Sequence, residues 1–386
     1  MTQPEVSSPE EQSILDGIDV WVEREVRPIA MKFDLADEYP HDLVESMREM
    51  GLFGATISQE YGGLGLSAWQ YAQIIMKISS VWMAPTGILN SHLIMAHAIE
   101  RAGTDEQKRH YLPMMATGEY RGSLALTEPN AGSDLQAIRT KAVHDGDAYV
   151  VNGTKTWITN SYFGSGTLLL VKTDTDADPR YKGMTMLLAD KGPGFEVTSK
   201  FKKLGYRAID TCEVVFNDYR VPDDRVLGGT EGSGFFQAAG GLELGRINVA
   251  ARGAGLAEGA LARALRYSQE RHTFGKPICE HQAIQLKLAE MTSQVEAARC
   301  LIKNAAIKHD TGARCDLESS IAKYFASEAG LFCSQEAMRI FGGYSFSVEY
   351  EIERYYRDAM LMCIGEGTNE ILKTVIAKQL VSRNTI

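Results

Sequence analysis

Apolar residues recur at helical spacing through residues 1–120, and capping signals mark where helices begin. Residues 8–11 (SPEE) combine a Ser N-cap, a first-turn Pro and a Glu three positions after the cap, which is a capping box. Residues 104–107 (TDEQ) repeat the signal, and Gly118 ends the helix that follows. Another helix is predicted over roughly 41–50, ending at Gly51. The apolar face of the first helix comprises Ile14, Ile18, Val22 and Val26.

Between residues 121 and 228 the pattern changes to short runs rich in β-branched and aliphatic residues. These runs are LLLVK (168–172), MTMLLA (184–189) and CEVVF (212–216). The turn-forming pairs that separate such runs are Asp145-Gly146, Asn152-Gly153 and Pro193-Gly194. This region is predicted to be an antiparallel β domain.

From residue 229 to residue 386 the helical pattern returns. Its long amphipathic segments are 233–270, 280–311, 316–341 and 367–382. Four long helices after a β domain predict a four-helix bundle. The fold class is therefore α+β, with an N-terminal helical domain (1–120), a middle β domain (121–228) and a C-terminal bundle (229–386).

Charge and composition exclude several functions. The net charge of −10 argues against nucleic acid as the main partner, because phosphate binding needs clustered Lys and Arg. No apolar run approaches the ~20 residues of a membrane span, and the acidic N-terminus is not a secretory or transit signal. The six cysteines are scattered and the histidines lack ligand spacing, so we expect no metal site and a location in a reducing bacterial cytoplasm.

Two motifs in the β region have both a functional and an ordinary explanation. LALTEPNAGSD (124–134) is rich in donors and small residues, so its backbone N–H groups can form an anion-binding nest, although such a stretch is also an ordinary hairpin loop. TKTWITN (154–160) places a Trp between two threonines. That Trp is either core packing or an aromatic wall against a planar cofactor.

Three motifs in the helical region are equally ambiguous alone. ERHTFGKPICEHQ (270–282) places cations around a Phe-Gly turn, which also describes a solvated inter-helix loop. RIFGG (339–343) ends a helix with glycines, and a ligand can approach closely there. CIGEGTNEIL (363–372) places Glu366 between two glycines, whereas most lone glutamates are surface residues. P-loop, Rossmann and G-x-S-x-G motifs are absent from the sequence.

Taken together and in this order, these stretches resemble the acyl-CoA dehydrogenase family over nearly the whole chain. The shared motifs are LTEPNAGSD, WITN, LGR (244–246), ERHTFGKPI, HQ, RIFGG, RDA (357–359) and EGTNEI. The resemblance implies a helical, β and four-helix-bundle domain order, a homotetramer and non-covalently bound FAD.

The resemblance also implies which residues contact FAD, some of them from a neighbouring subunit. The positions that match are Leu126, Thr127, Ser133, Trp157, Ile158, Thr159, Arg271, Phe274, Gln282, Arg339, Gly342, Gly343, Thr368 and Glu370. Arg339 stands where the family often has Gln. A helix N-terminus, as at Thr368, suits negatively charged phosphate.

In most of the family the Glu of the EGT motif is the catalytic base, and here that residue is Glu366. It would take the α-proton of an acyl-CoA thioester while the β-hydride passes to flavin N5, giving a trans-2-enoyl-CoA. Some members carry the base directly before the Arg of the LGR motif, but Gly245 stands there and cannot serve. Glu243 and Arg246 match substrate contacts. An electron-transfer flavoprotein is the implied electron acceptor.

The acyl group is less constrained by sequence. Gly365 replaces a bulky aromatic that is common before the Glu, which either widens the pocket for a branched acyl group or is neutral. Residues 88–99 are expected to line the acyl tunnel. The substrate-side candidates are Ser91, Ile94, Met95, Ser133, Gly365 and Gly367.

Other functions stay open at this point. An acyl-CoA oxidase would reduce oxygen instead, and a related enzyme would act on an acyl group bound to a carrier protein. A non-catalytic scaffold or ligand-binding member is a further class, but the intact Glu366 and FAD positions argue against it.

Overall fold

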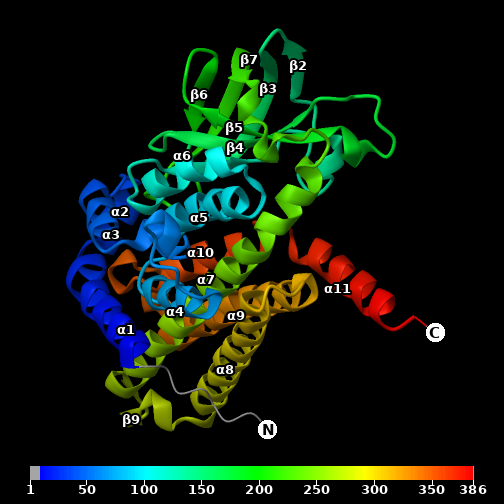
Figure 1. The fold of residues 1–386 in the computed structure, drawn as a ribbon. Helices are drawn as coiled ribbons and strands as arrows, with labels where there is room; N and C mark the ends of the chain where they lie inside the picture. Colours follow the sequence, from blue (N-terminus) through cyan, green and yellow to red (C-terminus); the bar gives the residue numbers. More distant parts are fainter. Residues whose placement is uncertain (1–8, 386) are drawn as a thin grey trace.

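The computed structural model describes residues 9–385, beginning with an N-terminal helical region (Figure 1). Its elements are α1 (Pro9–Trp21), a π-helical turn (Val22–Val26), α2 (Arg27–Ala36), α3 (His41–Glu49), α4 (Ala68–Ser79), α5 (Ala84–Ala102) and α6 (Asp105–Ala116). The capping box at Thr104 is confirmed, because its side chain accepts from the Gln107 backbone and Gln107 accepts from the Thr104 backbone. Ser8 of the other predicted box lies outside the described residues.

The middle region is a curled seven-stranded sheet. Its strands are β1 (Gly122–Ala125), β2 (Lys141–Asp145), β3 (Ala148–Thr159), β4 (Gly166–Lys172), β5 (Met184–Asp190), β6 (Phe195–Lys200) and β7 (Thr211–Pro222). They lie in the order β1-β4-β2-β3-β7-β6, and β5 pairs with β4. The predicted antiparallel arrangement needs one correction, since β1–β4 and β2–β4 are parallel pairs. The antiparallel β2–β3 hairpin lies between β1 and β4 in the sequence, and β4 runs parallel to β1.

One predicted turn is wrong. Asn152-Gly153 lies inside β3, at a shift in register against β7. A Cβ at Gly153 would overlap the Thr140 side chain, so the glycine permits close approach of two chain segments and makes no reversal. The Asp145-Gly146 turn is confirmed between β2 and β3, where Gly146 has a φ of +72°.

The C-terminal region contains the predicted long helices. They are α7 (Gly234–Glu270), α8 (Gln282–Asp310), α9 (Asp316–Phe341) and α11 (Asn369–Arg383), with a small hairpin of β8 (His272–Thr273) and β9 (Lys276–Pro277) after α7. The sequence analysis did not predict a further helix, α10 (Ile352–Ile364). Gly253 of α7 and Gly330 of α9 let these two helices approach closely, because a Cβ at Gly253 would lie 2.6 Å from the Ala326 carbonyl oxygen. The α+β fold class is confirmed.

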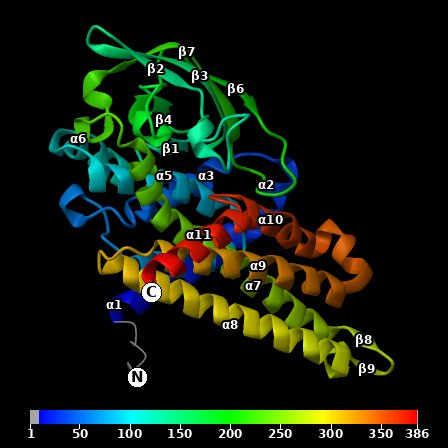
Figure 2. The ribbon, with the colours of Figure 1, turned by 90° about the vertical axis from the view of Figure 1, so that its right-hand side faces the viewer.

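Helix α7 connects the two ends of the molecule. With 37 residues it extends about 55 Å from the sheet to the β8–β9 hairpin. Figure 2 shows that hairpin at the end of the bundle opposite the sheet. One hydrophobic core is continuous from the N-terminal helices into the bundle, and a smaller one fills the sheet. Helix α5 packs against both α7 and β1, so residues from all three regions meet around it.

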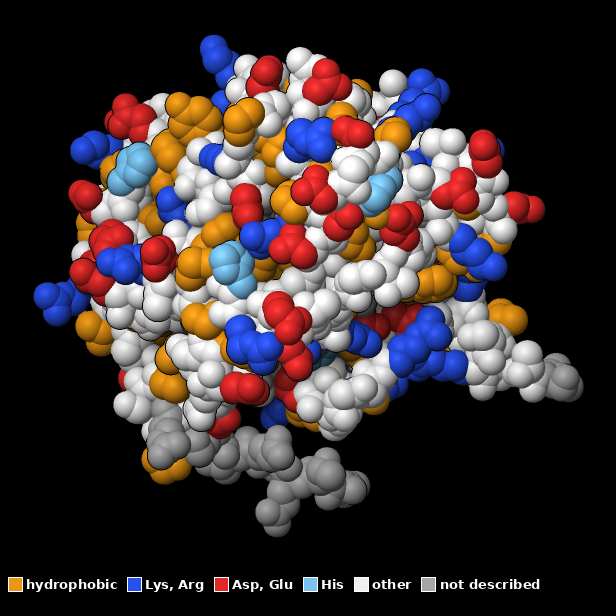
Figure 3. All heavy atoms as spheres, turned by 45° about the horizontal axis from the view of Figure 1, so that its top comes forward, with side chains coloured by type: hydrophobic (Ala, Val, Ile, Leu, Met, Phe, Trp, Pro, Cys, Tyr) orange, Lys and Arg blue, Asp and Glu red, His pale blue; other side chains and the backbone are white. Residues whose placement is uncertain are grey.

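The surface shows acidic and basic side chains interspersed on the face drawn in Figure 3. Among residues 9–385, no helix combines the length and the apolar character that crossing a membrane requires. The same residues contain no cluster of three or more His, Cys, Asp or Glu side chains placed to hold a metal ion.

Candidate active site

Glu366 lies on the short loop between α10 and α11 and points its carboxylate into the protein. Its φ of +53° is unusual for a residue with a side chain, and only 18% of its side chain is exposed. Asn90 of α5 donates to Oε1, and Arg252 Nη2 of α7 lies 3.4 Å from the same oxygen. Oε2 is buried and has no hydrogen-bond partner among the described residues. A buried carboxylate with one free oxygen is arranged to accept a proton from something that enters the site.

One face of α7 carries residues spaced three or four apart, namely Gly241, Gly245, Asn248 and Arg252, and it meets Glu366 at Gly245 and Arg252. A Cβ built at Gly245 would overlap Glu366 Oε2 and would approach Ile94 Cδ1 to 2.8 Å. The space that a side chain at 245 would fill is therefore occupied by the carboxylate of Glu366. A side chain at position 245 would therefore collide with Glu366, which is a steric reason for a glycine at this position.

Lys323 of α9 fixes the chain just after Glu366. Its Nζ is fully buried and donates to the Gly367 carbonyl oxygen at 2.8 Å and to Asn369 Oδ1 at 3.1 Å. Thr368 is the N-cap of α11 and accepts from the Ile371 backbone. The loop that carries Glu366 is thus held by one cation and one cap. Sequence reasoning missed Lys323, because nothing in its local context distinguishes it from other helical lysines.

Lys323 is expected to make stability depend on pH. Burial lowers the pKa of Lys323 to about 8. Between that value and the ordinary lysine pKa the folded state binds fewer protons than the unfolded state, so its contribution to the free energy of unfolding rises with pH. We expect Lys323 to contribute a slope on the order of 1 kcal/mol per pH unit from pH 8 towards pH 10, and Lys323→Met to lower the wild-type slope by that amount, while the similarly buried Lys155 keeps its own contribution. Denaturant unfolding of wild type and variant at several pH values measures the difference.

Lys373→Met is the control, because Lys373 is an exposed lysine over the Tyr324 ring. It should leave the pH slope unchanged. If the free energy of unfolding changed equally with pH in wild type and Lys323→Met, Lys323 would not be the source of the pH dependence.

The LTEPNAGSD loop is held by a buried ion pair. Lys155 Nζ lies 2.9 Å from Glu128 Oε1 and also donates to the Leu126 carbonyl oxygen. Burial lowers the pKa of Lys155 to about 8, while the charge of Lys155 helps to hold the pKa of Glu128 below its ordinary value against the effect of burial. Thr127 is half-buried and its carbonyl accepts from the Thr156 backbone, whereas Ser133 is exposed at the loop tip. The pair thus ties this loop to the WITN strand.

Trp157 projects from the sheet where β3 bulges against β7. Its φ is +64°, 58% of the residue is exposed, and its ring stacks on Phe201 with centroids 4.3 Å apart. Ile158 is buried in the core of the sheet, so only its backbone is available to a cofactor. Thr159 is half-buried at the strand end. The structure therefore favours an aromatic wall over core packing for Trp157.

Asn160, the last residue of WITN, fixes this strand end. Its Nδ2 donates to the carbonyl oxygens of Ile88 in α5 and Gly122 in β1. The tip of β3 is thereby joined to the helix that carries Asn90. Sequence reasoning did not single out this role.

A second group of predicted FAD residues lies at the other end of α7. Arg271, Gly342 and Gly343 line one hollow of about 460 Å³ together with Tyr267 and Tyr344. Phe274, at the tip of the β8–β9 hairpin, is 96% exposed with a φ of +51°. The two remaining predicted residues of this group are exposed. Gln282 lies at the start of α8, and Arg339 pairs with Glu336.

The substrate-side predictions are only partly brought together. Ile94 lies against Gly245 and Ser91 is half-buried on the same helix. Met95 packs its side chain beneath Gly122 of β1, about 100° around the helix from Ile94, and its place in the acyl tunnel stays a prediction. Asn90, which no motif marked, contacts the base instead.

Glu243 and Arg246 lie in the N-terminal half of α7. Glu243 is buried and lies 3.7 Å from Arg101, and together with burial, the larger effect, it raises the pKa of the Cys315 thiol to about 12. Arg246 is half-buried with Nε unpartnered among the described residues, and burial lowers its pKa. Gly365 has open space around it, since a Cβ there would meet only Leu361 at 3.4 Å or more.

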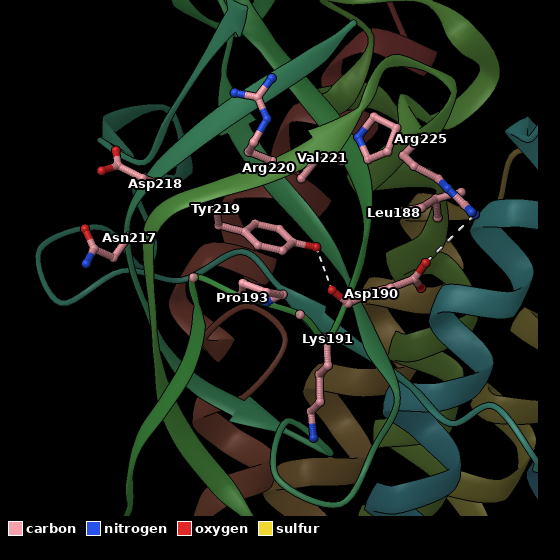
Figure 4. Close-up of a pocket in the computed structure, with 13 residues that line it drawn as sticks. Leu188, Asp190, Lys191, Pro193, Asn217, Asp218, Tyr219, Arg220, Val221 and Arg225 are labelled. Atoms are coloured by element: carbon pink, nitrogen blue, oxygen red, sulfur yellow. Dashed lines mark hydrogen bonds and ion pairs between the residues drawn. The ribbon is translucent and has the colours of Figure 1, made fainter.

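A larger hollow lies elsewhere, on the sheet. Figure 4 shows its lining, about 540 Å³ between the end of β5 and β7, where Tyr219 donates to the Asp190 carbonyl and Arg225 pairs with Asp190. It contains no predicted site residue, so its size does not identify the active site.

Comparisons with known proteins identify the family. Three family descriptions match: "Acyl-CoA dehydrogenase, N-terminal domain" at residues 8–119, "Acyl-CoA dehydrogenase, middle domain" at 123–219, and "Acyl-CoA dehydrogenase, C-terminal domain" at 232–381. The chain therefore belongs to the acyl-CoA dehydrogenase family. It is an oxidoreductase, and members of its family are FAD flavoproteins.

Individual relatives are similar over their full length. The acyl-CoA dehydrogenase of Bacillus subtilis (strain 168) is 39% identical over 360 residues, 93% of this chain and 94% of that protein. Butyryl-CoA dehydrogenase from Megasphaera elsdenii superposes with a TM-score of 0.95 at 34% identity, covering 98% of this chain and 100% of that chain. A chain from the structure of the electron transferring flavoprotein of Acidaminococcus fermentans gives 0.95 at 36% identity, with the same coverage.

Proposed function

We propose that the protein oxidises an acyl-CoA thioester to the trans-2-enoyl-CoA, with Glu366 as the base that takes the α-proton. The observation that carries the proposal is the buried carboxylate of Glu366, whose Oε2 has no partner among the described residues. Asn90 and Lys323 fix the side chain and the backbone on either side of it. A bound thioester excludes water from this carboxylate, and a positioned base contributes roughly 10²–10⁴-fold to the rate. FAD, when bound, supplies the acceptor for the hydride that leaves the β-carbon.

The residues present fit FAD in two separate groups. Trp157 offers an exposed ring in a strained backbone conformation near the tip of β3, and strain of this kind concentrates at ligand sites. Leu126, Thr127, Ser133 and Thr159 lie on the chain segments that flank it. Thr368 and Glu370 begin α11, where free N–H groups suit phosphate, and the pKa of Glu370 is lowered by its own backbone N–H.

The other group, around Arg271 and Phe274, lies at the far end of α7. Since α7 extends about 55 Å, one chain cannot bring both groups to the same flavin. We propose that a second copy supplies the second group, so that cofactor binding depends on a homotetramer.

Phe274→Asp is expected to lower both FAD affinity and oligomer mass. Burying a side chain that is 96% exposed in the single chain contributes about 2 kcal/mol or more, so the affinity for FAD should fall by about 30-fold or more. Flavin absorbance per chain and light scattering measure the two effects. Val143→Asp is the control, because Val143 is exposed on β2, outside both groups. A Phe274→Asp protein with full FAD and unchanged mass would contradict the shared site.

Glu243 and Arg246 are proposed to contact the CoA portion, together with Ser133, while Gly365 and Gly367 border the acyl group. The proposed electron acceptor is an electron-transfer flavoprotein, supported by the similarity to a chain in a structure of such a protein. The proposed location is the bacterial cytoplasm. The six cysteines are all free, as a reducing compartment allows.

The test is an anaerobic titration of the purified yellow protein with acyl-CoA thioesters while the flavin absorbance near ~450 nm is followed. Bleaching by one or more thioesters supports dehydrogenation. A flavin that no thioester bleaches would overturn the proposal. Fast reoxidation by air without an electron-transfer flavoprotein would overturn the proposed acceptor alone.

A further inference from the structure

Arg252 is a buried cation beside the base that the proposed reaction does not use. Only 4% of the residue is exposed, and it lies on the face of α7 that meets Glu366. Its Nη2 is 3.4 Å from Glu366 Oε1, its Nη1 is 3.4 Å from the Tyr206 hydroxyl, and its Nε has no partner among residues 9–385. A guanidinium carries five N–H donors, so this one makes only two long contacts.

The groups around Arg252 are polar as well. Asn90 of α5 and Asn248 of α7 are buried, and Asn248 Oδ1 has no partner among the described residues. Tyr206 lies against Gly87 of α5, and burial raises the pKa of the Tyr206 hydroxyl to about 12. A plain hydrocarbon chain placed here would leave these donors and acceptors buried and unsatisfied, which is costly.

We infer that the acyl group carries a carboxylate that binds Arg252, so that the substrate is the CoA thioester of a short dicarboxylic acid. A carboxylate can take two N–H groups of one guanidinium edge, while the other edge stays on Glu366. Arg252 then offsets the repulsion between the substrate carboxylate and the charged base. The inference rests on the proposed function, since it places the substrate at the same base.

The geometry also limits the length of the acid. Glu366 must lie within about 3.5 Å of the α-carbon, and a charge-assisted hydrogen bond to Arg252 is about 2.8 Å long. Because Arg252 and Glu366 are themselves in contact, the two ends of the acid are only a few bonds apart. A skeleton of roughly four to six carbons satisfies both contacts.

The test compares glutaryl-CoA and succinyl-CoA with pentanoyl-CoA and butyryl-CoA as reductants of the flavin in the holoenzyme. We expect kcat/KM for the best acid to exceed that for the neutral thioester of equal length on the order of 10²-fold. Arg252→Gln should remove that advantage mainly through KM, so that kcat/KM falls on the order of 10²-fold more for the acids than for the neutral thioesters of equal length. Arg263→Gln is the control, because Arg263 lies on the same helix but pairs with Glu351.

Each outcome decides between the two proposals. Bleaching by neutral thioesters without preference for acids overturns the dicarboxylic substrate and leaves the proposed function standing. An equal loss on acids and neutral thioesters in Arg252→Gln also overturns it, and assigns Arg252 to positioning Glu366. If no thioester bleaches the flavin, the proposed function fails and the substrate inference with it. The preference of the wild-type enzyme for acids over neutral thioesters is measured without any variant. It therefore tests the dicarboxylic substrate even if Arg252→Gln does not fold.

Discussion

Replacing Glu366 with glutamine is expected to leave the protein yellow and to abolish the reduction of its flavin by substrate. The amide keeps the size of the side chain and still accepts from Asn90 through its oxygen, so the loop should be undisturbed. What it lacks is the basic oxygen at the Oε2 position, which faces no partner among the described residues. The rate of flavin reduction, measured by anaerobic stopped-flow spectroscopy, should fall by roughly 10²–10⁴-fold or more.

Glu349→Gln is the matched control, since Glu349 is an exposed glutamate in the same C-terminal region. In this variant the substrate should reduce the flavin at the wild-type rate. Rapid flavin reduction by Glu366→Gln would show that another group takes the proton.

The second large effect is expected from a single methyl group. Gly245→Ala places a Cβ where Glu366 Oε2 lies, and its other near neighbour, Ile94 Cδ1, is the flexible end of a side chain. Both neighbours can move, so the free energy of unfolding should change by less than about 1 kcal/mol. The base must move to make room, however, and a displacement of about 1 Å from a productive geometry can cost about 10²-fold. Flavin reduction and thermal unfolding, measured on the same preparation, separate the two effects.

The control uses a glycine one turn earlier on the same face of α7. A Cβ at Gly241 would lie 3.6 Å from Ile94 Cγ2, an ordinary contact, and touches nothing of the base. Gly241→Ala should therefore keep full activity. If Gly245→Ala also keeps the wild-type rate, Glu366 does not act from the position seen here.

Three features of the structure depend on contacts that the sequence does not show. Asn90 and Glu366 are 276 residues apart, so no local pattern marks Asn90 as a partner of the base. Met95 is predicted to line the acyl tunnel with the rest of its helix, and only the packing of α5 against β1 shows that its side chain contacts Gly122. Asn152-Gly153 has the composition of a turn, yet the close approach of Thr140 makes it a bulge.

What the sequence by itself determined were the features that short-range physics encodes. Helical periodicity and the capping box at Thr104 located the first helix, α3, α6 and the four long C-terminal helices, and the β-rich runs located β4, β5 and β7. The glycines around Glu366 marked a residue outside regular structure. The motifs in order identified the family, and with it the cofactor.

The tertiary structure alone decided how Glu366 is surrounded. Helix α7 leaves room for the carboxylate at Gly245 and contacts it through the guanidinium of Arg252. The amide of Asn90 donates to it from α5, and Lys323 of α9 donates to the carbonyl oxygen of Gly367, the next residue. These contacts exist because three helices distant in sequence pack around one loop. The direction and charge of side chains at such a meeting point follow from packing, which hydrophobic periodicity does not specify.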